Sequence, residues 1–275
     1  MTSYSSPPGG LPPQTDLLSG RAIFTEAYAV IPRGVMTDIV ASAFPGWTGA
    51  RGWVIARPLS GFAETFSQII MELAPGGGAA APETDPKAEC VIFVTDGALT
   101  ITLDGESRRR EPGDYAYLPP DCGYALANEG AIPTRFHWIR KAYEPAPGLS
   151  APDPLFLGEA DIAPTPMPGA GGAWSTTRFV DPEDLRHDMH VTIVNLEPGG
   201  TIPFMETHVM EHGLYVLEGK GVYRLNGDWV EVEAGDFMWL RAFCPQGCYA
   251  GGPGNFRYLL YKDVNRLPRL GLGLR

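Results

Sequence analysis

Two stretches of this chain repeat each other at a constant shift of 122 residues, and this repeat constrains the fold more than any other feature. Residues 73–141 contain "VIFVTDGALTITLDGE" and "EPGDYAYLPPD", and residues 196–263 contain "LYVLEGKGVYRLNGDW" and "EAGDFMWLRAF". The landmark pairs that keep the shift are Gly97 with Gly219, Gly105 with Gly227, Gly113 with Gly235 and Arg135 with Arg257. The chain is therefore interpreted as two copies of one structural unit.

Each copy consists of short runs rich in Val, Ile, Tyr, Phe and Leu that are separated by turn residues. The "DG" pair at 104–105 and the "NG" pair at 226–227 are typical of two-residue hairpin turns. The 34 glycines and 27 prolines favour short strands over long helices. Helix is expected only in short segments such as 182–188, where Pro182 can occupy the first turn. The sequence predicts an all-β protein of two tandem antiparallel barrels.

The composition between the copies divides the chain into four parts. Residues 1–20 are expected to form a flexible arm, residues 21–142 a first barrel, and residues 175–275 a second barrel. Between them, residues 143–174 are rich in Pro, Gly and Ala and are interpreted as a linker.

The charge of the chain argues against two classes of partner. A net charge of −11 disfavours nucleic acid and anionic membrane surfaces, both of which reward clustered Lys and Arg. No apolar stretch approaches the roughly 20 residues of a membrane span, and the first residues lack a secretory pattern. We expect a cytoplasmic protein whose cysteines are free thiols: Cys90, Cys122, Cys244 and Cys248.

The segment "METHVMEHGLYVLEGKG" at 205–221 places Glu206, His208 and His212 close together in a chain with five histidines. Alternate residues of a strand point to one face, so Glu206 and His208 can share a face and His212 can reach it after a local turn. A lone histidine in a strand is more often a hydrogen-bonded structural residue than a metal ligand. The spacing around these residues decides between the two interpretations.

That spacing resembles the first motif of cupin proteins. Gly200 is followed by five residues, Glu206-x-His208, three residues, His212, six residues and Gly219, which is the cupin spacing with two ligand types exchanged. The second motif begins at Gly235 and places Gln246 where its histidine would stand. This second half is the weaker match, because Arg241, Phe243 and Ala250 replace its usual Pro, Gly and Asn.

A carboxylate, two imidazoles and an amide oxygen form an N/O donor set without thiolate, which suits Mn, Fe, Ni or Zn. The resemblance to cupins therefore implies a bicupin fold with a metal site in the second barrel. The predicted ligands are Glu206, His208, His212 and Gln246.

The first copy lacks the histidines. Glu83, Asp85 and Glu89 fall roughly at the ligand positions, and Tyr124 stands where the second copy has Gln246. Three carboxylates can hold a hard cation, but a solvated loop is the favoured interpretation. The first barrel is assigned a structural role.

The other histidines are expected to be structural, with one alternative left open. His137 corresponds to Leu259 and is interpreted as a core or interface residue. His187 and His190 precede the second barrel by one strand, and His190 is a minor candidate for its pocket.

Longer strings resemble the bacterial (S)-ureidoglycine aminohydrolases. They include "FTEAYAVIPRGVMTDIV", "RPLSGFAETFSQ", "WSTTRFVD" and "RYLLYKDVNR", and the resemblance runs from about residue 21 to 266. It implies a manganese enzyme of purine breakdown that converts (S)-ureidoglycine and water to (S)-ureidoglycolate and ammonia. By position, the four predicted ligands carry over as Mn²⁺ ligands, and Tyr223, Tyr258 and Lys262 carry over as residues that contact the substrate.

The residues agree with those roles. Tyr258 and Lys262 share strand parity and can face one cavity, although each tyrosine can equally be a core residue and Lys262 a surface lysine. One carboxylate ligand leaves a site of positive charge that attracts a small anionic ureide, and chelation would fix one enantiomer. Lys262 and a tyrosine are the candidates for proton transfer, with acid and base not divided between them.

Two other functions remain as alternatives. A cupin dioxygenase acting on a small chelating acid would use a redox metal and consume oxygen. A non-catalytic binding or storage bicupin would need no metal, and the asymmetry of the two copies argues against it. A homo-oligomer is expected because cupins often associate through strand edges.

Overall fold

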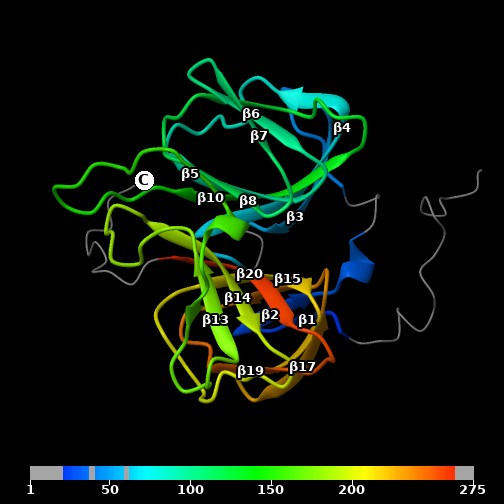
Figure 1. Ribbon diagram of the computed structural model, residues 1–275, viewed down its shortest axis with the longest axis vertical. Helices are drawn as coiled ribbons and strands as arrows, with labels where there is room; N and C mark the ends of the chain where they lie inside the picture. Colours follow the sequence, from blue (N-terminus) through cyan, green and yellow to red (C-terminus); the bar gives the residue numbers. More distant parts are fainter. Residues whose placement is uncertain (1–20, 37–40, 59–61, 264–275) are drawn as a thin grey trace, which may run out of the picture.

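The computed structural model describes residues 21–36, 41–58 and 62–263, so the predicted arm at 1–20 lies outside the described residues. These residues form two stacked lobes of curled antiparallel sheet (Figure 1). Besides strands, they contain two 3₁₀ turns, η1 (Arg33–Val35) and η3 (Glu159–Asp161). The prediction of an all-β protein with two antiparallel barrels is confirmed.

The first lobe is a nine-stranded sheet with the order β11-β8-β5-β10-β4-β9-β6-β7, to which β3 adds by pairing with β4. Every pairing in it is antiparallel. Its strands are β3 (Trp47–Ala56), β4 (Phe66–Ala79), β5 (Ala88–Asp96), β6 (Leu99–Leu103), β7 (Glu106–Arg110), β8 (Asp114–Leu118), β9 (Tyr124–Ala127), β10 (Thr134–Ala142) and β11 (Leu155–Gly158).

The second lobe combines an eight-stranded sheet, in the order β1-β2-β18-β15-β20-β14-β13-β12, with a three-stranded sheet, β17-β16-β19. Its strands are β1 (Ile23–Phe24), β2 (Tyr28–Ile31), β12 (Thr165–Pro166), β13 (Trp174–Arg178), β14 (Met189–Leu196), β15 (His212–Glu218), β16 (Lys220–Leu225), β17 (Asp228–Glu233), β18 (Phe237–Leu240), β19 (Gln246–Ala250) and β20 (Phe256–Asp263).

The lobes exchange strands across the expected boundaries. Strands β1 and β2 precede the first repeat, yet β2 pairs with β18 of the second repeat, and Figure 1 shows both in the lower lobe beside β13–β20. Strand β11 comes from the expected linker and pairs with β8 of the first repeat. Each sheet is therefore completed by chain from outside its own repeat.

The shift of 122 residues relates the strands as well as the letters, since β5–β10 correspond in order to β15–β20. Both hairpin turns use a left-handed residue, Asp104 at φ 52° and Asn226 at φ 54°. Gly97 and Gly219 have φ values of 68° and 76°. A Cβ atom would lie 2.5 Å from the Pro133 carbonyl oxygen at Gly97, and 2.0 Å from the Asn255 carbonyl oxygen at Gly219. Only glycine fits there in both copies.

Alternation along the strands creates three cores. One fills the first barrel, with Phe136 and Trp138 of β10, and another fills the second, with Tyr258 of β20. The third lies between the lobes and takes the opposite face of the same strands, including Leu259 and Tyr261 of β20. The two barrels are thus joined through a continuous apolar layer.

Two smaller expectations have different outcomes. The helix predicted at 182–188 is wrong, because Asp181 and Asp184 accept backbone N–H bonds from Glu183 and Arg186 and hold two successive turns instead. The prediction of free thiols is confirmed for all four cysteines. In the described part of the chain, no helix has the length and apolar composition to cross a bilayer.

Candidate metal centre and active-site cavity

A cavity of about 220 Å³ opens inside the second barrel. Side chains from β13, β14 and β20 form one wall, and the segment that leads into β15 forms the other. Its volume is below the roughly 300–1,000 Å³ of sites for drug-sized ligands. The cavity therefore suits a small molecule.

Three of the four predicted ligands line this cavity, and the side chain of the fourth, Gln246, contacts one of them. Glu206, His208 and His212 line it, as expected from their spacing. Gln246 begins β19 directly opposite Glu206, and their backbones exchange two hydrogen bonds of 2.8 and 2.9 Å. This bridge brings together residues that are 40 positions apart in the sequence.

The two imidazoles are already arranged as a pair. Nε2 of His208 lies 3.1 Å from Nε2 of His212 and 3.1 Å from the side-chain amide nitrogen of Gln246. Two nitrogens that bind one ion at about 2.1 Å and at right angles to each other lie about 3.0 Å apart. A half-turn of the Gln246 amide places its oxygen toward the same point. The chemistry of these three groups fits a divalent metal ion.

His212 is held in the tautomer that a metal ligand needs. Its Nδ1–H donates to the carbonyl oxygen of Glu211 at 2.9 Å, which leaves the lone pair on Nε2. Burial lowers the pKa of His212 to about 3, and the neighbouring His208 lowers it further. Burial likewise lowers the pKa of His208. Both rings are therefore neutral at physiological pH.

Glu211 connects His212 to the first repeat. Its buried carboxylate accepts N–H bonds from Glu64 at 2.7 Å and Thr65 at 2.8 Å, and one from the Trp239 indole at 2.5 Å. Sequence reasoning missed this residue, although the shift of 122 pairs it with the equally buried Glu89. The first barrel thus helps to fix the backbone that carries His212.

The carboxylate of the predicted set is less organised than the imidazoles. Within the described residues, no group of three or more His, Cys, Asp or Glu side chains is close enough together to hold a metal ion. Burial raises the pKa of Glu206, and the charge of Lys262 opposes that shift. The pair of imidazoles is therefore the preformed part of the centre.

The predicted catalytic residues divide into two layers. Lys262 and Tyr258 line the cavity, as their shared strand parity predicts. Tyr223 lies behind Tyr258, with the two ring centres 6.1 Å apart, and is not part of the cavity wall. Burial raises the pKa of both phenols well above 10. Burial lowers the pKa of Lys262, and the charge of Arg178 lowers it further.

Two polar residues of the wall had little or no place in the sequence prediction. His190, a minor candidate, does line the cavity, and its pKa is lowered to about 4 by burial and by the charges of Lys262, His187 and Arg178. Arg178 was missed, although Trp174, Thr176 and Arg178 alternate along β13 and all three line the cavity. This period of two was the available signal.

The remaining histidines are structural. His137 is buried between the lobes, where its Nδ1 lies 3.2 Å from the Gln68 amide nitrogen and its ring packs on Tyr215. This confirms the expectation of a core or interface residue. His187 is also buried and packs edge-on against Tyr117 at a centroid distance of 5.0 Å.

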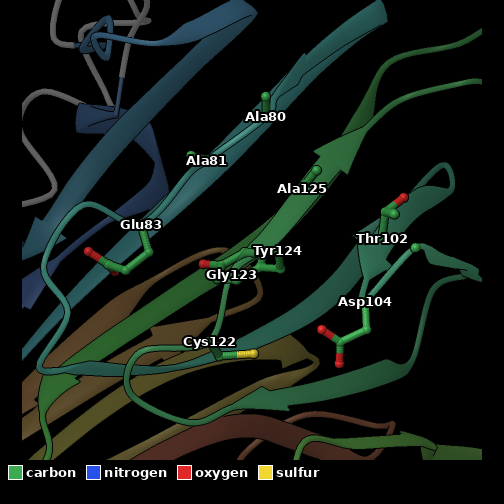
Figure 2. A pocket seen from close by; sticks show the side chains of 10 residues that line it. Ala80, Ala81, Glu83, Thr102, Asp104, Cys122, Gly123, Tyr124 and Ala125 are labelled. Carbon is green, nitrogen blue, oxygen red and sulfur yellow. The ribbon is translucent and has the colours of Figure 1, made fainter.

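In the first repeat, the three acidic residues do not form a cluster. Glu83 pairs with the Arg140 guanidinium, Asp85 is exposed, and Glu89 is buried on the opposite face, where it accepts a hydrogen bond from the Tyr117 hydroxyl. The favoured interpretation of a solvated loop holds for Asp85 alone. Figure 2 shows the hollow that Glu83 lines, with the carboxylates of Glu83 and Asp104 on opposite sides.

Comparison with known proteins agrees with this geometry. The model of the cupin domain matches residues 69–140 and 192–261. A curated (S)-ureidoglycine aminohydrolase from Arabidopsis thaliana is 34% identical over 251 residues, which cover 90% of this chain and 79% of the relative. The (S)-ureidoglycine aminohydrolase from Escherichia coli K12 is 29% identical, with 91% and 94% covered.

A solved structure is closer in sequence. A putative glyoxylate-induced protein from Pseudomonas aeruginosa, known from its crystal structure, is 64% identical in sequence. The match covers 99% of this chain and 100% of the other, with a TM-score of 0.89. The cupin model matches both repeats, and the two curated relatives align with 90% and 91% of this chain. The chain belongs to the (S)-ureidoglycine aminohydrolase family of cupin proteins.

Proposed function

We propose that this chain hydrolyses (S)-ureidoglycine to (S)-ureidoglycolate and ammonia, with a divalent metal ion, Mn²⁺, bound in the second barrel. The observation that carries the proposal is the pair of neutral imidazoles, His208 and His212, in a small cavity that also holds Lys262. The names of the curated relatives support the substrate.

The residues that would hold the metal are Glu206, His208, His212 and Gln246. Such an ion would supply an anchor for the substrate carboxylate and a second donor atom, and would orient the reacting carbon. The side chains that bind and orient the rest of the substrate belong to the cavity wall. A carboxylate substrate is favoured there, because Arg178 and Lys262 add positive charge to that wall.

Lys262 is the best candidate for proton transfer. Replacing the amino group requires one proton to reach the leaving nitrogen and one to leave the incoming water, so a single group that gives a proton and then takes one serves both steps. Because its pKa is lowered, the Lys262 ammonium gives up a proton more readily than the ammonium of an exposed lysine. Tyr258 keeps its proton, because burial raises its pKa, and acts as a hydrogen-bond donor.

The test is direct. Mn-loaded protein is mixed with freshly generated (S)-ureidoglycine, and ammonia and ureidoglycolate are followed against the spontaneous decay of the substrate. We expect faster release of ammonia without oxygen uptake. A rate equal to spontaneous decay would reject the proposal, and oxygen uptake would instead indicate a dioxygenase.

The wider setting is part of the same proposal. The reaction places the chain in purine breakdown, after the opening of allantoate, and in the cytoplasm. A homo-oligomer is proposed from its cupin character, and size-exclusion chromatography with light scattering measures it.

A further inference from the structure

The inward face of the second barrel carries a row of polar residues. His212 of β15 pairs across the sheet with Lys262 of β20, and Lys262 pairs with His190 of β14. Arg178 of β13 lies diagonally beyond His190, because its own partner on β14 is Thr192. Neighbouring strands are about 4.8 Å apart, so the row spans about 14 Å from the β15 backbone to the β13 backbone.

At the far end of this row, a buried ring nitrogen without a partner lies beside a half-buried guanidinium. His190 is 7% exposed, lines the cavity, and its Nε2 has no hydrogen-bond partner. Arg178 makes a side-chain contact of 3.5 Å with the sulfur of Met167, and within the described residues no carboxylate lies at ion-pair distance from it. Buried polar groups are almost always satisfied, so the unpartnered Nε2 of His190 points to a ligand, and the half-buried Arg178 in the same cavity wall can bind that ligand too.

The two side chains offer complementary hydrogen-bonding groups. The Arg178 guanidinium only donates. His190 is neutral at physiological pH, because its pKa is lowered to about 4, and it therefore has one donor and one acceptor nitrogen. A carboxylate only accepts, whereas a ureido group accepts at its carbonyl oxygen and donates at its nitrogens. Arg178 can therefore donate to a ureido carbonyl oxygen, and His190 can accept from a ureido N–H.

We infer that Arg178 and His190 form a subsite for the ureido group of the substrate. Arg178 donates to the ureido carbonyl oxygen, and His190 accepts from a ureido N–H. The chelating acid end then lies toward His208 and His212, and Lys262, in the middle of the row, faces the carbon between the two ends. This inference rests on the proposed function and adds which residues select the substrate.

Two ligands separate this assignment from the main alternative, in which Arg178 holds the carboxylate. (S)-Ureidoglycolate and glycolate share a hydroxy-acid end, and glycolate lacks the ureido group. Isothermal titration calorimetry on Mn-loaded protein gives the ratio of the two dissociation constants. We expect the unaltered protein to bind ureidoglycolate more tightly.

Arg178→Gln should weaken ureidoglycolate binding by about tenfold or more, the effect of losing a charged hydrogen bond, and leave glycolate within about twofold. His190→Phe keeps a flat ring and should weaken ureidoglycolate by about three- to tenfold, again without affecting glycolate. Arg109→Gln is the matched control, because Arg109 is exposed in the first repeat. Unchanged glycolate binding also shows that each variant is folded and loaded.

Two results would overturn the inference. Equal weakening of both ligands in Arg178→Gln would assign Arg178 to the shared carboxylate. Unchanged binding of both ligands in both variants would remove the subsite. Failure of the proposed function is distinct from either, since the unaltered protein would then neither bind glycolate with its metal nor accelerate the release of ammonia.

Discussion

The two barrels place different chemistry on the same framework. At the shift of 122 residues, Cys90 stands where the second barrel has His212, Tyr124 where it has Gln246, and Arg140 where it has Lys262. Cys90 lies 3.3 Å from the Tyr124 hydroxyl, and Arg140 pairs with Glu83 through both nitrogens of its fork. In the first barrel, therefore, the Arg140 guanidinium neutralises the Glu83 carboxylate.

The second barrel leaves the corresponding charges apart. Within the described residues, no carboxylate lies at ion-pair distance from Lys262, and Glu206 has no ion-pair partner either. An internal ion pair closes a site, while separated groups of opposite charge leave room for an ion and a substrate. This contrast supports the proposal that the second barrel binds the metal ion and the substrate, while the first barrel has a structural role.

The largest effect is expected at His212. His212→Ala should remove the metal and lower turnover by at least about 100-fold, because one of the two preformed imidazoles is lost. Metal analysis and an ammonia assay measure the two outcomes. Cys90→Ala, at the matched position of the first barrel, should keep both metal and turnover and cost about 1 kcal/mol of stability. Equal loss of metal in both variants would contradict the division of roles.

A second contrast joins Lys262 and Arg140. Lys262→Met should lower turnover by about 10²–10⁴-fold with the metal retained, since proton transfer is lost and the ligands stay in place. Arg140→Met should leave turnover within about twofold but lower the free energy of unfolding by roughly 1–3 kcal/mol, because Glu83 loses its partner. Urea unfolding and steady-state kinetics measure both. Ordinary kinetics in Lys262→Met would reject its role.

The contact between the barrels should respond to pH through His137. Burial lowers its folded pKa to about 3, below the unfolded value of about 6.5, so the stability of the neutral form is present above pH 6.5 and lost as the pH falls toward 3. His137→Leu takes the residue found at the matched position 259. Between pH 7.5 and 5, the variant should lose about 2 kcal/mol less stability than the unaltered chain in urea unfolding. Parallel curves for the two proteins would contradict this.

Much of this arrangement could be predicted from the sequence, because its signals are local. The two-residue turns and strand alternation are read within a few residues, and the spacing from Gly200 to Gly219 placed Glu206, His208 and His212 at one cavity. The repeat shift also relates Arg140 to Lys262, so a cation at this position of the first barrel could be predicted, but its partner Glu83 could not.

Other features depend on contacts that leave no local pattern. Pairing of β2 with β18 joins strands about 200 residues apart, and nothing in the short run of β2 names its partner. The role of Glu211 depends on backbone N–H groups of Glu64 and Thr65 in the other barrel. Such interactions follow from how the lobes pack, which the letters of one strand do not encode.

The smallest effect is expected at Asp85, and it tests whether the first barrel binds a cation. Asp85→Asn keeps the oxygen that accepts the Lys87 N–H and removes only the charge. Because Asp85 is exposed and Glu83 and Glu89 have other partners, stability should change by less than about 0.5 kcal/mol and the amount of Mn²⁺ bound should stay the same. Calorimetric titration with Mn²⁺ measures this. Loss of a second bound ion in the variant would show that the first barrel also holds a metal, and would make the two barrels more alike than their ion pairs indicate.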